Sequence, residues 1–238
     1  MDLLKVKAEK IGIALSDEQL ELFQKYYELL IETNKVMNLT AITEYEEVIE
    51  KHFIDSILLG TIMNLTGRKR LIDVGTGAGF PGIPLKIVYP ELEVTLLDSL
   101  NKRVGFLNHV IEELRLAEIE AIHARAEDAG RNKIYRDEFD LCVSRAVANL
   151  STLSEYCMPF VKQGGYFISY KSNQIEEELK QAENAIRLLG GRLEEDGTKA
   201  VAIPDSDIIR QFVMIHKIKP TPKAYPRKAG TASKEPLH

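Results

Sequence analysis

The chain has 238 residues, of which 45% are hydrophobic and 28% charged, and its net charge at pH 7 is −5. These totals are ordinary for a soluble globular protein, long enough to bury the core of one α/β domain with an appendage. No apolar run approaches the length of a membrane span and the N-terminus lacks a signal-peptide core, so we expect a cytoplasmic protein without a membrane partner.

The first 65 residues carry two helix patterns. Ser16 begins a capping box with Gln19, and the apolar spacing that follows predicts an amphipathic helix that ends near Asn34. Thr43 begins a second capping box ahead of another apolar stripe. We therefore expect residues 1–65 to form a helical region that packs against the main sheet.

Two short motifs lie in this region, NLTAI at residues 38–42 and KHFIDS at residues 51–56. His52 and Asp55 of the second motif are three residues apart, so they share one face of a helix. The pair would line the pocket or contact a base, and the alternative is a structural hydrogen bond.

A glycine-rich turn follows the first strand pattern. Residues 71–74 predict a buried strand, Gly75, Gly77 and Gly79 come next, and Ile83–Tyr89 predicts a helix. Glycine lets the backbone bend sharply and come close to a ligand. The spacing differs from the dinucleotide fingerprint G-x-G-x-x-G and no G-K-[ST] is present, which argues against NAD and ATP. A nucleotide-type pocket and a purely structural turn are the two interpretations.

Two carboxylates flank this turn. The second strand, residues 94–97, ends at Asp98, where such sheets present a carboxylate to a ribose, and the alternative is a helix cap. Asp73 lies inside the first strand, and a buried carboxylate needs hydrogen bonds or a nearby cation. A sulfonium-bearing ligand would supply that cation, and the alternative is that Asp73 caps local backbone amides.

A helix is predicted over residues 101–114, with Lys102 and Arg103 in its first turn. Positive charge at that end opposes the helix dipole. Contact with a phosphate or a salt bridge to a nearby acid would account for this placement.

The third predicted strand, residues 119–123, leads into the sequence ARAED. Ala126 and Glu127 fall where a nucleotide-binding sheet meets an adenine, and Glu127 or Asp128 would accept a hydrogen bond from its amino group. The alternative for these acids is a solvated loop.

The fourth predicted strand, residues 139–143, is followed by SRAV, which places Arg145 at the carboxyl end of the sheet. Ligands bind at that edge in open α/β sheets. The two cysteines, Cys142 and Cys157, lack metal-ligand spacing, so we expect both in the core and no metal site.

The remaining elements complete the sheet. The patterns predict a helix at 149–160, a fifth strand at 164–170 ending at Lys171, a helix at 174–189, and strands at 192–202 and 208–218. No helix pattern separates the last two strands. Since parallel neighbours need a crossover, the last strand should run antiparallel to the others.

The C-terminal segment is basic. From Lys217 onward six basic residues stand against one acid, so this segment carries +5 and residues 1–216 carry −10. Residues 220–238 are rich in Pro, Lys and small residues, and we expect an extended tail that buries no core, with Tyr225 available to stack. Because the overall field does not attract phosphate, nucleic-acid binding must come from local patches.

Five parallel strands with intervening helices and a final antiparallel pair describe the α/β, Rossmann-like fold of class I S-adenosylmethionine-dependent methyltransferases. We expect a seven-stranded, mostly parallel sheet with the last strand antiparallel over residues 66–219. Seven motifs in order, NLTAI, KHFIDS, DVGTGAGFPGIPL, DSLNKR, RAED, SRAV and YPRKAGT, resemble the ribosomal RNA small-subunit methyltransferase G family, also called glucose-inhibited division protein B.

Members of that family methylate N7 of a guanosine in small-subunit (16S) ribosomal RNA. The resemblance implies that S-adenosylmethionine is bound by Gly75, Phe80, Ala126, Glu127 and Arg145, with Asp98 at the ribose. The turn itself adds to this pocket Asp73, Gly77 and Gly79.

Guanine N7 has an in-plane lone pair and no proton, so it can attack a sulfonium methyl without a general base. The sequence agrees, because it lacks both a [DN]-P-P-[FY] tetrad after the fourth strand and a Pro-Cys. We expect alignment by Arg145, His52 and Asn38 instead of acid–base catalysis. Arg145 would contact the methionine carboxylate, or the guanine and its phosphate.

The expected partner is small-subunit ribosomal RNA or the assembling subunit, bound by a monomer. Basic side chains should hold its phosphates, and the candidates are Lys51, Lys102, Arg103, Lys171, Arg227 and Lys228. The alternative functions are a small-molecule methyltransferase and a non-catalytic RNA-binding module.

Overall fold

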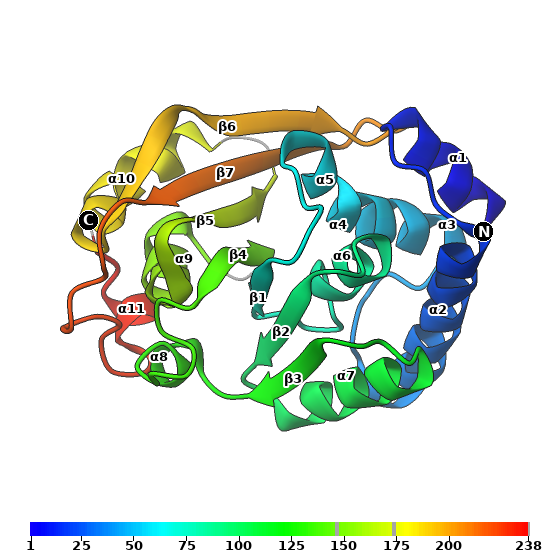
Figure 1. Cartoon of the computed structure of the whole chain (residues 1–238), viewed down its shortest axis with the longest axis horizontal. Coiled ribbons are helices and arrows are strands. Elements are labelled where there is room, and N and C mark those ends of the chain that lie inside the picture. Colours follow the sequence, from blue (N-terminus) through cyan, green and yellow to red (C-terminus); the bar gives the residue numbers. More distant parts are fainter. Residues whose placement is uncertain (146–147, 173–174, 238) are drawn as a thin grey trace.

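A seven-stranded sheet forms the middle layer of the computed structural model, which describes residues 1–145, 148–172 and 175–237 (Figure 1). The strand order is β3-β2-β1-β4-β5-β7-β6, and β7 runs antiparallel to both of its neighbours. The expected antiparallel last strand is therefore confirmed. The strands are β1 (Arg70–Val74), β2 (Glu93–Asp98), β3 (Ile119–His123), β4 (Phe139–Arg145), β5 (Val161–Lys171), β6 (Gly191–Ala202) and β7 (Ile209–Lys217).

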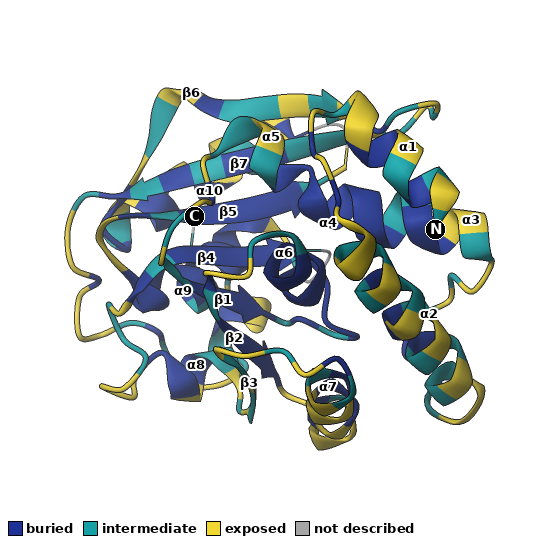
Figure 2. Ribbon diagram, turned by 45° about the vertical axis from the view of Figure 1, so that its right-hand side comes forward, coloured by how far each residue is buried: buried dark blue, intermediate teal, exposed yellow. Residues whose placement is uncertain are grey.

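The central strands are apolar because both of their faces are covered. Nearly every residue of β1, β2 and β4 is buried, whereas the edge strand β3 is half-exposed, as Figure 2 shows. Cys142 and Cys157 lie in the core, as expected. The helices between the strands are α6 (Gly82–Val88), α7 (Asn101–Glu113), α8 (Ala126–Ala129), α9 (Leu150–Cys157), the 3-10 turn η2 (Met158–Phe160) and α10 (Glu176–Leu188), and α11 (Thr231–Lys234) follows the last strand.

The N-terminal region is helical, as expected, and joins the core that contains α6 and α7. The Ser16 capping box is confirmed, since Gln19 N donates to Ser16 Oγ at 3.2 Å and Ser16 N to Gln19 Oε1 at 2.9 Å. The elements are α1 (Asp2–Lys10), α2 (Asp17–Met37), α3 (Tyr45–Val48), the π-helical turn η1 (Ile49–Ile54), α4 (Asp55–Ile57) and α5 (Leu59–Ile62).

The second capping box, at Thr43, is wrong. The N-cap of α3 is Glu44, which makes no side-chain cap, so the helix begins one residue later than expected. Glu46 then occupies the second helical position, from which it cannot complete a capping box with Thr43.

The C-terminal segment is not the extended tail that we expected. Thr221, Pro226 and Ala232 are buried, and the segment packs beside α8 and α9. The segment has few large apolar residues, but arginines from other parts of the chain donate hydrogen bonds to its backbone carbonyls. Arg136, for example, donates to Tyr225 O at 2.9 Å. Lys217, counted among the basic residues of this segment, is also fully buried.

Candidate active site

The glycine turn after β1 is held against the neighbouring strand. Gly75 has φ +73° and its N–H donates to Leu97 O at 2.9 Å. Gly79 has φ +105°, and a Cβ there would lie 2.5 Å from Ile83 Cδ1. Both positions therefore require glycine, the first for its backbone conformation and the second also for space.

Asp98 lies at the end of β2 and is 3% exposed. Its Oδ2 accepts from Gly77 N at 3.0 Å, and Oδ1 accepts from Leu100 N at 2.9 Å. Arg103 approaches Oδ2 at 3.5 Å. The carboxylate thus joins the glycine turn to Leu100, the residue before α7. Leu100 is the N-cap of α7 and the helix has no side-chain cap, so Asp98 does not cap it. The carboxylate also faces a cavity.

This first cavity, of about 200 Å³, lies at the carboxyl ends of β1, β2 and β3. Glu127 is buried and lines this cavity, whereas Asp128 is exposed and is not among the lining residues. A contact of Glu127 with an adenine stays a prediction. We call this first cavity the donor cavity. Its lining comprises Val74, Gly75, Leu97, Asp98, Ser99, Ala124, Arg125, Ala126, Glu127, Tyr156, Gly230 and Ser233.

Asp73 is fully buried beneath the turn. Its Oδ2 accepts from Thr76 Oγ1 at 2.7 Å and from Gly82 N at 2.8 Å, so the carboxylate does cap local groups. Its Oδ1 has no partner among the residues that the structure describes. Burial raises the pKa of Asp73 to about 6. A contact with a sulfonium stays a prediction.

Arg145, at the end of β4, belongs to a second cluster. Its guanidinium donates to Asp55 Oδ2 at 2.7 Å, to Lys51 O at 2.9 Å and to His52 Nδ1 at 3.2 Å. Arg210, at the start of β7, donates to both oxygens of the same fully buried Asp55, at 2.6 and 3.0 Å. Sequence reasoning missed Arg210, because 155 residues separate it from Asp55.

His52 and Phe80 complete this cluster. The two rings stack at 4.4 Å, and the Arg145 guanidinium lies 5.2 Å from the centre of the Phe80 ring. His52 Nε2 contacts Thr40 Oγ1 at 2.9 Å. Burial, together with the charge of Arg145, lowers the pKa of His52 to about 4, so its imidazole is neutral at pH 7.

A second cavity, of about 350 Å³, opens beside this cluster. We call it the arginine cavity. Because Lys171 at the end of β5 pairs with Gln211 near the start of β7, this cavity lies at the same carboxyl edge of the sheet as the donor cavity. It is lined by Ile42, Lys51, His52, Asp55, Arg145, Ile203, Ile208 and Arg210.

The expected site residues thus divide between two places. Gly75, Asp98, Ala126 and Glu127 line the donor cavity, whereas Arg145 and His52 line the arginine cavity. Asn38 is exposed and ends α2 in the left-handed conformation that asparagine tolerates, with φ +50°. Ala146 and Val147 of the SRAV motif, and Gln174 at the expected helix start, lie outside the described residues.

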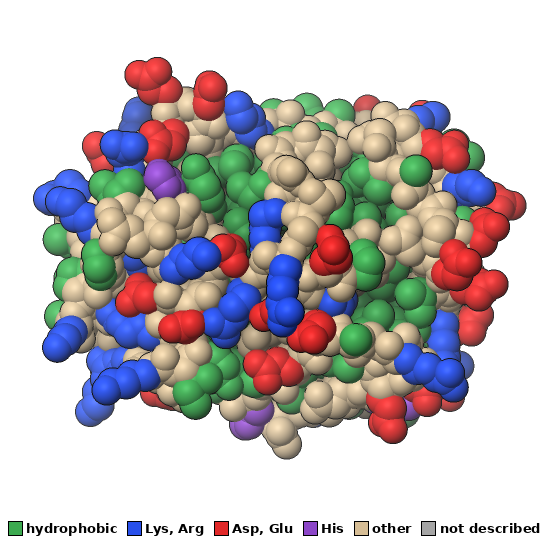
Figure 3. Space-filling view, in the orientation of Figure 1, with side chains coloured by type: hydrophobic (Ala, Val, Ile, Leu, Met, Phe, Trp, Pro, Cys, Tyr) green, Lys and Arg blue, Asp and Glu red, His purple; other side chains and the backbone are tan. Residues whose placement is uncertain are grey.

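The candidate phosphate contacts differ in how far they are already engaged. Lys51 pairs with Glu47, Arg103 with Asp98, Lys171 with Glu178 and Arg227 with Glu155. Lys102 and Lys228 are exposed and have no side-chain partner within the described part of the chain. Figure 3 shows Lys and Arg gathered at the left-hand end of the molecule, where Figure 1 places the C-terminus.

In the part of the chain that the structure describes, no helix combines the length and the apolar composition needed to cross a membrane. No group of three His, Cys, Asp or Glu side chains among the described residues is arranged to hold a metal ion.

The lining of the donor cavity fits the nucleoside part of S-adenosylmethionine. Val74, Leu97 and Ala126 offer apolar walls to a flat ring, and Asp98 and Glu127 offer oxygens to hydroxyl and amino groups. A glycine turn after the first strand and a carboxylate at the end of the second are features of nucleoside-binding parallel sheets. Together with the antiparallel β7 between β5 and β6, they make this a Rossmann-like methyltransferase fold.

Solved structures agree with this class. The crystal structure of M. jannaschii TYW2 in complex with AdoMet matches with a TM-score of 0.56 at 15% identity, over 75% of this chain and 80% of that chain. The Methanococcus jannaschii fibrillarin pre-rRNA processing protein matches with a TM-score of 0.52 at 16% identity, over 69% and 74%. At these identities the likeness concerns the fold alone.

The chain belongs to the rRNA small subunit methyltransferase G (GidB) family, whose model matches residues 19–200. The ribosomal RNA small subunit methyltransferase G of Lachnoclostridium phytofermentans is 55% identical over 95% of this chain and 93% of its own length. The protein of the same name from Clostridium novyi is 49% identical over 99% and 96%. The family resemblance of the ordered motifs is thereby confirmed.

Proposed function

We propose that this S-adenosylmethionine-dependent ribosomal RNA methyltransferase transfers the methyl group to N7 of a guanosine in the small-subunit RNA. The observation that carries the proposal is the pair of cavities at one edge of the sheet. The donor cavity is lined by carboxylates, and the arginine cavity by Arg145, Arg210 and Lys51. Phe80, which follows the glycine turn, stacks on His52 and lies against Arg145 of the arginine cavity.

The donor cavity supplies binding and orientation. Asp98 and Glu127 would hold the ribose and adenine of S-adenosylmethionine, whose sulfonium carries the methyl group to be transferred. Gly75 lines the cavity next to Val74, the last residue of β1. Fixing two reactants in this way can lower a barrier by roughly 7–11 kcal/mol.

The arginine cavity suits an acceptor that needs no deprotonation. Asp55 accepts hydrogen bonds from two guanidinium groups, so its carboxylate is engaged. His52 is neutral and its Nδ1 accepts from Arg145 in the Nε2–H tautomer, which leaves no free base there. Guanine N7 has a lone pair and no proton to lose. Arg145 and Lys51 would orient the base and its phosphate.

The test uses labelled S-adenosylmethionine and unmethylated small-subunit RNA, presented both naked and within assembled subunits. We expect label on one guanosine, and none when the transcript contains 7-deazaguanosine, which has carbon in place of N7. Label on 7-deazaguanosine RNA would exclude N7 as the acceptor. Label on protein or small metabolites would exclude RNA as the substrate. Sedimentation of the free protein tests the expected monomer.

A further inference from the structure

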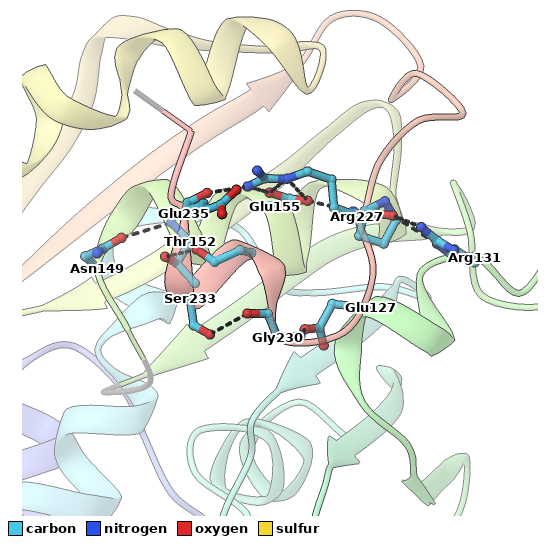
Figure 4. Close-up of polar contacts among 11 residues, drawn as sticks. Glu127, Arg131, Asn149, Thr152, Glu155, Arg227, Gly230, Ser233 and Glu235 are labelled. Carbon is cyan, nitrogen blue, oxygen red and sulfur yellow. Dashed lines mark hydrogen bonds and ion pairs between the residues drawn. The ribbon is translucent and has the colours of Figure 1, made fainter.

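The C-terminal segment closes one side of the donor cavity. Gly230 and Ser233, which precede and lie within α11, line it together with Asp98, Glu127 and Tyr156. Figure 4 shows Gly230 beside Glu127. More than 70 residues separate these two positions from Tyr156 along the chain. The segment therefore reaches the cavity only through tertiary contacts.

A buried ion pair holds the segment in place. Glu155, on α9, is 0% exposed, and its carboxylate accepts from Arg227 Nε at 3.0 Å and from Arg227 Nη2 at 2.7 Å. The backbone N–H of Arg227 donates to Glu155 Oε1 at 2.6 Å. The bidentate guanidinium of Arg227 compensates the buried charge of Glu155. Without Arg227 this carboxylate would be a buried, uncompensated charge.

Contacts on both sides of Arg227 extend this anchor. Arg131 donates to Pro226 O at 2.7 and 2.9 Å, and Thr152 Oγ1 donates to Ala232 O at 3.1 Å. Thr152 and Glu155 lie on α9, which also supplies Tyr156 to the cavity. One helix thus fixes the segment and lines the site with adjacent residues.

The segment also contacts the carboxylate that faces the cavity. Gly230 N donates to Glu127 Oε1 at 2.8 Å, and Gly230 has φ +81°, a conformation that favours glycine. This bond orients Glu127 and leaves its second oxygen for a ligand.

We propose that residues 226–235 form part of the S-adenosylmethionine-binding site and are positioned by the Glu155–Arg227 pair. Arg227 is then a positioning residue and not a phosphate contact. The inference rests on the proposed use of the donor cavity. It assigns to the segment a role in binding a small molecule in the absence of RNA.

The first test is the double variant Glu155→Gln/Arg227→Met in the full chain. It removes both charges of the pair together, so neither is left buried without its partner. Calorimetry with S-adenosylhomocysteine, without RNA, should show binding at least tenfold weaker than wild type. The matched control is Lys223→Ala, which changes an exposed lysine of the C-terminal segment that precedes residues 226–235. This variant should bind S-adenosylhomocysteine as wild type does. Limited proteolysis reports whether the segment is released, and thermal unfolding reports whether the body stays folded.

The second test leaves the ion pair intact, so it decides the matter if the double variant fails to fold. Ser233→Trp places a large ring in the cavity wall, whereas Lys234→Trp places it on the same short helix at an exposed position outside the lining. We expect at least tenfold weaker binding from the first and less than twofold change from the second.

Two results would overturn the inference: a folded double variant with a released segment and wild-type affinity, or equal affinities for the two tryptophan variants. If wild type itself binds no S-adenosylhomocysteine, the proposed function fails instead, and the two failures are distinct.

Discussion

The two cavities at the carboxyl edge of the sheet have linings of opposite net charge, since carboxylates outnumber Arg125 in the donor cavity and cations outnumber Asp55 in the arginine cavity. In the donor cavity, carboxylates accept backbone N–H groups: Asp98 from Gly77 and Leu100, and Glu127 from Gly230. In the arginine cavity, two guanidinium groups converge on the single carboxylate of Asp55. The first polarity suits a cationic methyl donor with hydroxyl groups, and the second suits an anionic nucleic acid. One sheet edge can therefore hold two ligands of opposite charge side by side.

The largest expected effect breaks the arginine side. Asp55→Ala would leave Arg145 and Arg210 without their shared buried partner, and we expect the free energy of unfolding to fall by about 3–5 kcal/mol. Urea denaturation measures it. The control is Glu47→Ala, which removes the partner of Lys51 in a surface pair and should cost about 0–1 kcal/mol. Equal losses from the two variants would contradict a buried role for Asp55.

The next effect concerns Asp73, under the donor side. Burial raises its pKa from 3.8 to about 6, so the native protein retains a proton that the unfolded chain releases. The stability that this carboxyl contributes is present below pH 3.8 and is lost as the pH rises through 6. Asp73→Asn, which cannot titrate, should therefore gain about 3 kcal/mol relative to wild type between pH 4 and pH 7.

Chemical denaturation of both proteins without ligand, at several pH values across this range, checks the prediction for Asp73. The asparagine oxygen can still accept from Thr76 and Gly82, so the loop should persist. Parallel stability curves for the two proteins would show that the carboxyl does not titrate with a raised pKa.

Asp98→Asn sharpens the donor side. In wild type the two carboxylate oxygens of Asp98 accept from two backbone N–H groups, those of Gly77 and Leu100. The asparagine amide has only one acceptor oxygen, so its NH₂ group would face the second N–H, and two donors cannot form a hydrogen bond. We expect affinity for S-adenosylhomocysteine to fall tenfold to a hundredfold, about 1.4–2.7 kcal/mol, with RNA affinity unchanged. Asp128→Asn, an exposed acid beside Glu127, is the control. A loss of RNA affinity in Asp98→Asn would mean that the two cavities are not separate sites.

The smallest effect is expected at Lys102, an exposed lysine in the first turn of α7. If its ammonium contacts a phosphate, Lys102→Ala should weaken RNA binding a few-fold and reduce the slope of log affinity against log salt by about 0.7–0.9. Lys180→Ala, on α10, should leave that slope unchanged. A salt titration of RNA binding compares them, and an unchanged slope in Lys102→Ala would make it a solvated surface charge.

The family and the sheet could be predicted because their signals are local. The glycine turn directly follows β1, Asp98 ends β2, and Glu127 lies in the short helix α8 after β3. Parallel strands bring their carboxyl ends to one edge. The antiparallel last strand followed from the missing crossover between the last two strands. These inferences needed the order of the elements but no knowledge of distant contacts.

The C-terminal segment shows where local reasoning failed. Its composition predicts an extended tail that buries no core, since it has few large apolar residues. The structure supplies what composition cannot show: Glu155 for Arg227, and Arg131 and Arg136 for the backbone carbonyls. A basic residue in a sequence looks the same whether it faces solvent or a buried carboxylate.

The sequence by itself determined the fold class, the family and the presence of carboxylates near the strand ends, because strand patterns, glycine spacing and strand ends are written in consecutive residues. Only the tertiary structure decided that Arg145 shares Asp55 with Arg210 and that Gly230 and Ser233 line the donor cavity. Those contacts join residues far apart in the chain, and their energies depend on burial, which no local pattern records.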